Sequence, residues 1–215
     1  MRKIFFLSIT LLVIGMSSVS AQAVWGLRAG MSRPTVTDYE GSSLKGKFGL
    51  EIGPVLYYSL KGNFYLNSGL MFSMKTIKDS YSGLDSEWGK YKDEYTLNIS
   101  HLEIPLYIGY SIPIGKFHTY VQAGPYIGFN LSAKQKAREF YDGEYESYTE
   151  NVVEYISPFN AGLGLVGGIN INRFKLEVGY QHGLIDINND LFDTFDGSEV
   201  SIKLASLFFG VSYVF

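Results

Sequence analysis

The sequence has no cysteine and little charge. None of its 215 residues is Cys, which excludes disulfides, thiol nucleophiles, Cys-based metal sites and a lipidated N-terminal Cys. Charged residues make up 18 % of the chain, less than the ~25 % typical of soluble domains. The 18 Lys and Arg do not outnumber the 21 Asp and Glu, so no general basic field favours nucleic acid. The 46 % hydrophobic content excludes a disordered chain, and the length fits one domain.

Long apolar runs are also lacking, apart from one at the N-terminus. Arg2 and Lys3 precede the apolar run 4–16, and the small residues of 17–21 follow it. This order is typical of a secretory signal peptide, and the run is too short for the ~20 residues of a transmembrane helix. We predict a signal peptide over 1–21 and a mature domain over 22–215, which carries a net charge of 16 − 21 = −5.

From residue 24 onward, apolar residues alternate with polar or small ones. The alternation predicts strands at about 24–32, 47–59, 64–75, 95–110, 117–132, 157–171, 173–184 and 201–215. The connections at 60–63, 111–116 and 172 are short, whereas those at 33–46, 76–94, 133–156 and 185–200 are long. An even number of strands with short turns at one end and long loops at the other is typical of an outer-membrane β-barrel. We therefore expect an all-β, eight-stranded, antiparallel up-and-down transmembrane barrel.

The two faces of these strands differ in composition. One face is apolar and nearly uncharged, which suits lipid but not water. The other face is rich in glycine, which leaves room for neighbouring tyrosines in a narrow lumen. Five charged residues have this lumen parity, and we expect a cross-lumen network that plugs the barrel: Arg28, Glu51, Glu103, Lys175 and Glu177. The other 18 acidic residues are predicted to lie in the four long loops.

Two groups of residues fit this prediction less simply. Pro54, Pro105 and Pro125 fall inside predicted strands, where we expect bulges or local widening. His182 lies near the long-loop rim and could form a catalytic site with Asp186 or Ser201, although polar packing is the simpler interpretation.

Several segments resemble the PorT-like outer-membrane β-barrel family. The segment 101–110 (HLEIPLYIGY) is similar to a strand of that family, and so are 124–131, 174–180 with 183–186, and 210–215. The resemblance implies the barrel fold and residence in the outer membrane of a Gram-negative bacterium. It implies no catalytic residue. The terminal Phe215 resembles the aromatic end that the barrel-assembly machinery recognises.

These features together predict a non-enzymatic integral outer-membrane barrel that needs no cofactor and has no metal site. Its extracellular loops would bind a partner or serve an accessory or structural role. The expected partners are outer-membrane lipid and lipopolysaccharide, the barrel-assembly machinery, and an extracellular or secretion-apparatus protein. Nucleic acid is not expected. Two alternatives stay open, a narrow porin-like solute channel and an enzyme that modifies lipid A. The loop 133–156 is the strongest candidate for binding, because it is the longest and mixes tyrosines with acidic residues.

Overall fold

The computed structural model describes residues 23–37, 45–85, 89–115, 117–141, 144–188 and 201–215. These residues form one antiparallel sheet and a short 3-10 helix. The elements are β1 (Ala23–Thr37), β2 (Lys45–Lys47), β3 (Gly49–Ser59), β4 (Phe64–Gly69), β5 (Met71–Asp85), β6 (Gly89–Ile114), β7 (Phe117–Tyr141), β8 (Glu144–Asn151), η2 (Val153–Tyr155), β9 (Phe159–Ile171), β10 (Phe174–Gly183) and β11 (Lys203–Val214). The predicted signal peptide and its cleavage site lie outside the described residues.

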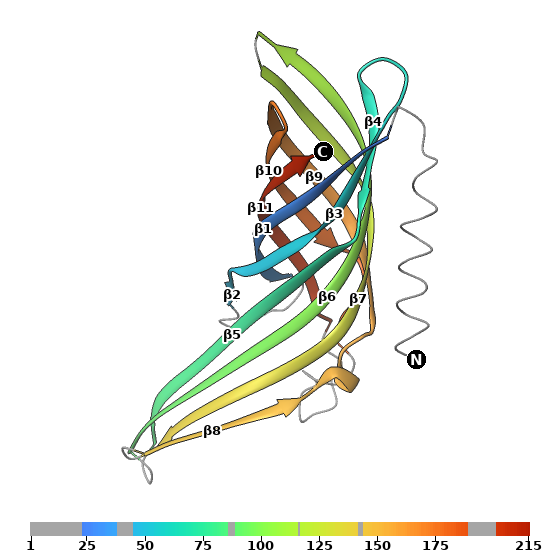
Figure 1. Cartoon of the computed structure of the whole chain (residues 1–215). Coiled ribbons are helices and arrows are strands. Elements are labelled where there is room, and N and C mark those ends of the chain that lie inside the picture. The colour runs from blue at the N-terminus through green and yellow to red at the C-terminus, as the bar shows by residue number, and fades with distance from the viewer. Residues whose placement is uncertain (1–22, 38–44, 86–88, 116, 142–143, 189–200) are drawn as a thin grey trace.

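The sheet closes into a ring, which confirms the eight-stranded barrel. β4 and β5 follow each other along one strand position, so the ring runs β1, β3, β4/β5, β6, β7, β9, β10 and β11. β11 then pairs with β1, from Gly26 opposite Val214 to Thr37 opposite Lys203. Closure leaves no free edge in the ring, so each strand backbone finds its hydrogen bonds within the protein. Figure 1 shows the ring together with the strands that project from it.

The short turns and both described ends of the chain lie at one end of the ring. Gly62, Gly115 and Asn172 adopt positive φ angles of 72°, 59° and 56°, which the tight turns between successive strands require. The backbone N–H of Phe215 donates to the carbonyl of Trp25 at 2.9 Å, so the last residue is tied to the first strand. We call this the short-turn end.

Two of the four spans predicted as long loops are strands instead. Residues 76–85 and 89–94 continue β5 and β6, which stay paired from Met71–Glu103 to Asp85–Gly89. Residues 133–141 continue β7, and β8 returns beside it. The prediction failed because these segments are mostly polar and lack the apolar alternation by which strands were identified. Continuous pairing with the neighbouring strand nonetheless makes them strands. The prediction that only three acidic residues lie in strands was wrong for the same reason.

The prolines interrupt the pairing without shifting it. Leu70 separates β4 from β5 and lies between the neighbouring strands that carry Pro54 and Pro105. Its N–H still donates to the carbonyl of Pro54 at 3.0 Å, and the register is the same on both sides of the gap. A register shift does occur between β6 and β7, but at Ser100 and His101. The expected bulges at the prolines were therefore wrong, and the sheet instead loses a few ladder bonds there.

Burial alternates along the ring strands as the sequence pattern predicts. In β6, Tyr107 is 0 % exposed, whereas its neighbours Leu106 and Ile108 are 53 % and 59 % exposed. The outward face is thus apolar and uncovered, and the inward face holds the polar and aromatic side chains. Among the described residues, no helix is both long enough and apolar enough to span a membrane.

Candidate functional site

The middle of the barrel interior holds a buried arginine between two carboxylates. Arg28 on β1 donates to Glu51 on β3 at 3.0 Å and to Glu177 on β10 at 3.1 Å. The guanidinium also lies 4.9 Å from the centre of the Phe208 ring. Three predicted lumen residues therefore meet directly, from three different strands. Each charge gains a partner where burial would otherwise make it costly.

Lys175 occupies an aromatic cage nearer the short-turn end. Its ammonium lies 3.7 Å from the ring centre of Tyr57, 4.5 Å from that of Tyr120 and 5.0 Å from that of Tyr65. Tyr120 donates to the second oxygen of Glu177 at 2.9 Å, which connects the cage to the arginine. Ring faces attract a cation, so the cage holds Lys175 without a direct carboxylate contact.

Glu103 lies on the other side of the arginine, toward the end that carries the long hairpins. It accepts a hydrogen bond from Gln181, which also contacts the Tyr107 hydroxyl at 3.1 Å. Its second oxygen lies 3.6 Å from Nε2 of His101. Lys75 is buried nearby and interacts electrostatically with Glu103. Lys75 was missed as a lumen residue, although the predicted strand 64–75 already gave it the right parity.

The six charged residues of the interior balance one another. Three are cationic and three are anionic, and every acidic residue predicted to face the lumen is among them: Arg28, Lys75, Lys175, Glu51, Glu103 and Glu177. The network spans the barrel interior from the tyrosine cage to the Glu103 level.

Six of the inward glycines lie directly against the ring of a large side chain. A Cβ atom added at Gly168 would lie 2.5 Å from the Tyr120 ring, and one added at Gly162 would lie 2.7 Å from that of Tyr126. The same overlap occurs in four further pairs, Gly109 with Tyr65, Gly164 with Tyr107, Gly179 with Phe208 and Gly128 with His101. Glycine thus gives the large side chains room to fill the narrow interior.

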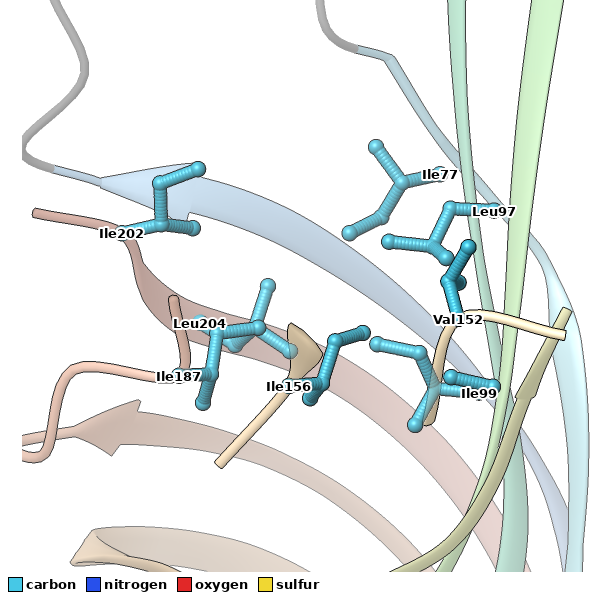
Figure 2. Close-up of a cluster of buried hydrophobic side chains, with 9 residues drawn as sticks. Ile77, Leu97, Ile99, Val152, Ile156, Ile187, Ile202 and Leu204 are labelled. Carbon is cyan, nitrogen blue, oxygen red and sulfur yellow. The ribbon is translucent and has the colours of Figure 1, made fainter. Parts of the chain in front are cut away.

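An apolar cluster covers the polar interior at the hairpin end. Figure 2 shows its side chains pointing toward one another from opposite walls, with Ile202 and Leu204 on one side and Ile77 and Leu97 on the other. Ile156, which follows η2, lies between them. The remaining members of the cluster are Ile99, Ala133, Val152 and Ile187.

Beyond this cluster, four strands leave the ring as a projecting sheet, the arm (76–85, 89–98, 134–141 and 144–151), visible at the lower left of Figure 1. Residues paired directly across an antiparallel sheet share one face, so the register assigns each arm residue to a side. The side continuous with the barrel interior, which we call the acidic face, carries Asp79, Asp93, Glu139, Glu146 and Glu150. The described residues place no Lys or Arg on this face beyond the apolar cluster.

The opposite side of the arm is basic. It continues the outward face of the barrel, and the short strand β2 adds to it by pairing with β5. The side chains that the structure describes on this basic face include seven cations and one carboxylate: Lys45, Lys47, Lys78, Lys92, Lys134, Lys136, Arg138 and Glu94. The arm is therefore a thin sheet with opposite charge on its two sides.

Glu94 is held among the cations of the basic face. Its carboxylate contacts the ammonium groups of Lys78 at 2.8 Å and Lys92 at 2.9 Å, and these hydrogen bonds lower the pKa of Glu94 to about 2. Beside it lies a hollow of about 420 Å³, lined by Lys92, Glu94, Arg138, Phe140, Glu146 and Ser147. Two cations, two carboxylates and an aromatic ring thus line one depression.

The remaining predicted residues have local partners. Asp186 accepts backbone hydrogen bonds from Asn188 at 2.8 Å and Ile202 at 2.9 Å. His182 lies 3.5 Å from the Tyr180 hydroxyl. Within the described part of the chain, the two are not joined to each other. Phe215 is 72 % exposed and packs against Tyr213, with ring centres 5.5 Å apart.

Comparison with known proteins agrees with the barrel architecture. Residues 18–189 match the family described as outer membrane protein beta-barrel domain. OprG from Pseudomonas aeruginosa is 15 % identical over 90 % of this chain and 94 % of its own, with a TM-score of 0.46. Ail from Yersinia pestis is 13 % identical over 90 % and 99 %, with a TM-score of 0.34. No curated protein matches the sequence.

The family match spans most of the chain, and the ring of eight paired strands is the architecture that such a domain requires. The outward apolar band is then the lipid-facing surface. The chain belongs to the outer membrane protein beta-barrel domain family, and it is an outer-membrane β-barrel.

Proposed function

We propose that this protein is a non-enzymatic, closed barrel that presents the arm as a binding element at the cell surface. The observation that carries this proposal is the contrast between a filled interior and a sheet that projects well past the ring. Rings, a charge-balanced network and an apolar cluster occupy successive levels of the lumen. An eight-stranded barrel is narrow enough for side chains to fill it, so transport is not the favoured role.

The proposed orientation puts both termini in the periplasm and the arm outside the cell. The short-turn end carries exposed aromatic residues such as Phe64 and Tyr110, whose ring centres lie 4.9 Å apart, as expected at a membrane interface. Long hairpins of outer-membrane barrels face the exterior. The arm would therefore stand at the surface, where it can meet a partner.

Conductance and lipid analysis test the proposal against its two alternatives. The purified, folded chain in a planar bilayer should give no stepwise conductance, and regular open-channel steps would favour a solute channel instead. The lipid A of cells with and without the protein should have the same mass spectrum. A mass change that depends on His182 would favour an enzyme.

An arm-shortened variant tests where binding is located. Short glycine-containing turns would join Ser80 to Glu94 and Lys136 to Thr149, which are directly paired residues, so the remaining hairpins keep their register. The cut leaves the apolar cluster intact. We expect only the wild-type chain to restore the surface phenotype of a deletion strain, and restoration by the variant would contradict the proposed role of the arm.

The partners of biogenesis are part of the same proposal. Phe215 is exposed at the end of the last strand, where the barrel-assembly machinery could bind it. Deleting Phe215 should lower assembly in the outer membrane but leave secretion across the inner membrane unchanged. Normal assembly of that variant would show that Phe215 is not required as an assembly signal. The secretion-apparatus partner implied by the PorT-like resemblance stays a prediction.

A further inference from the structure

The basic face begins where the lipid-facing band ends, on the same side of the same strands. On β5 the outward residues run from Phe72 and Met74, 38 % and 46 % exposed, to Thr76 and then Lys78. On β7 they run from Phe129 and Leu131 to Lys134 and the cations beyond it. A surface that follows the outward side of the barrel away from the membrane core therefore changes from apolar to cationic.

The opposite side of the arm differs from the basic face in the sign of its charges. The acidic residues of the arm face the side continuous with the lumen, whereas the cations face the side continuous with the lipid-facing surface. Apart from the buried Asp79, the charged side chains described in the arm are at least partly exposed, so hydration does not force either sign to one side. Opposite charges placed on neighbouring strands would also be the more stable arrangement. The separation thus indicates that an anion meets the basic face.

The single carboxylate of the basic face does little to reduce its positive charge. Glu94 is engaged by Lys78 and Lys92, so it neutralises part of the cluster and leaves a surplus of cations around it. Arg138 lies directly opposite Glu94 on β7 and lines the same hollow as Phe140 and Lys92, together with the carboxylates of Glu94 and Glu146. The surplus of positive charge therefore comes from the cations around the hollow, such as Lys134 and Lys136, and a row of cations suits phosphate groups.

We propose that the basic face binds the phosphate groups of lipopolysaccharide in the leaflet that surrounds the barrel. This inference rests on the proposed function and names a partner for one side of the arm. The basic face continues the lipid-facing side of the strands. An anion that belongs to a lipid of the surrounding leaflet lies on this side, so we assign the phosphate to a lipid. A soluble anion would have equal access to both sides.

The test titrates the full mature chain, folded in zwitterionic micelles, with bisphosphorylated lipid A. One variant combines Lys134→Gln, Lys136→Gln and Arg138→Gln on the basic face. Its matched control combines Asp93→Asn, Glu139→Gln and Glu150→Gln on the acidic face of the arm, away from the hollow beside Glu94. A basic residue near an anionic surface contributes roughly fivefold in affinity, so three should contribute on the order of 100-fold.

We expect that loss in the basic-face variant, no loss in the acidic-face variant, and weak binding of dephosphorylated lipid A by the wild-type chain. An equal loss in both variants, or wild-type affinity for the dephosphorylated lipid, would overturn the inference. Inorganic phosphate is titrated alone as a third ligand, and binding as tight as that of lipid A would show that the lipid is not the source.

Folding and function are kept separate in this design. Altered migration on gels without boiling shows that each variant has formed its barrel. Unchanged lipid A binding by the basic-face variant would contradict only the inference that the basic face binds the phosphate groups. If the arm-shortened variant restored the surface phenotype of the deletion strain, that result would instead contradict the proposed function.

Discussion

Charge is arranged in opposite ways in the two regions of this molecule. Inside the barrel, each cation lies close to carboxylates or aromatic rings, as with Arg28 between Glu51 and Glu177. In the arm, the described cations and all the described acidic residues except Glu94 are on opposite sides of one sheet. Strands β5, β6 and β7 run without a break from the ring into the arm, so the arrangement of charge changes along the same strands.

The difference reflects what surrounds each region. An unpaired charge in the interior has no water to solvate it, so the network of Arg28 and its partners is a condition of stability. Most described charges of the arm are at least partly exposed to solvent, and separated charges cost little there. Since stability does not require the separation, binding is the more direct explanation for it. The predictions below test this contrast, from the largest expected effect to the smallest.

Removing the central cation should have the largest effect. Arg28→Ala leaves Glu51 and Glu177 buried without their shared partner, and should lower the free energy of unfolding by about 3–5 kcal/mol. The control is Arg33→Ala, five residues further along β1 and exposed, which should cost no more than about 1 kcal/mol. Denaturant unfolding in micelles measures both. Equal stability of the two variants would contradict a structural role for the interior network.

A single methyl group on the inward face should have an intermediate effect. Gly168→Ala places a Cβ 2.5 Å from the Tyr120 ring and should destabilise the barrel by about 1–3 kcal/mol. The adjacent Gly167→Ala is the matched control, since its Cβ would meet only the Tyr120 carbonyl oxygen at 3.9 Å. The same unfolding measurement compares them. A tolerated Gly168→Ala would show that the interior is packed more loosely than the structure indicates.

Acid should weaken the arm slightly without affecting the ring. The pKa of Glu94 is lowered to about 2, so its ion pairs stabilise the folded arm above the ordinary carboxyl pKa of 4.5. That contribution is lost as the pH falls from about 4.5 to about 2, and an exposed pair is worth at most about 1 kcal/mol. Hydrogen exchange of the arm amides across this pH range measures the effect. In Glu94→Gln the dependence should vanish, and its persistence would assign the effect to another group.

The sequence predicted the ring because the lipid-facing strands alternate strictly. The residues of 102–110 place apolar side chains on one face, and the structure shows this same alternation in burial. The partners of Arg28 could not be predicted. Parity assigns a residue to the lumen, but its height depends on the stagger between strands, which only the paired structure reveals.

The arm was missed because its strands have no apolar face. Between 78 and 94 and between 134 and 150, the sequence is mostly polar and has no sustained apolar alternation, so the pattern resembles a polar loop. The signal was nonetheless present as an alternation of charge, as in Arg138 followed by Glu139. A period of two in charge predicts a strand as a period of two in hydropathy does.

The independence of the two regions is tested most directly by the free energy of unfolding of the arm-shortened variant. Its ring, interior network and apolar cluster are intact, so we predict normal barrel assembly and a free energy of unfolding within about 1 kcal/mol of wild type. A variant that fails to assemble, or that loses several kcal/mol, would contradict the account by showing that the arm is part of the stable scaffold and not a separate binding element.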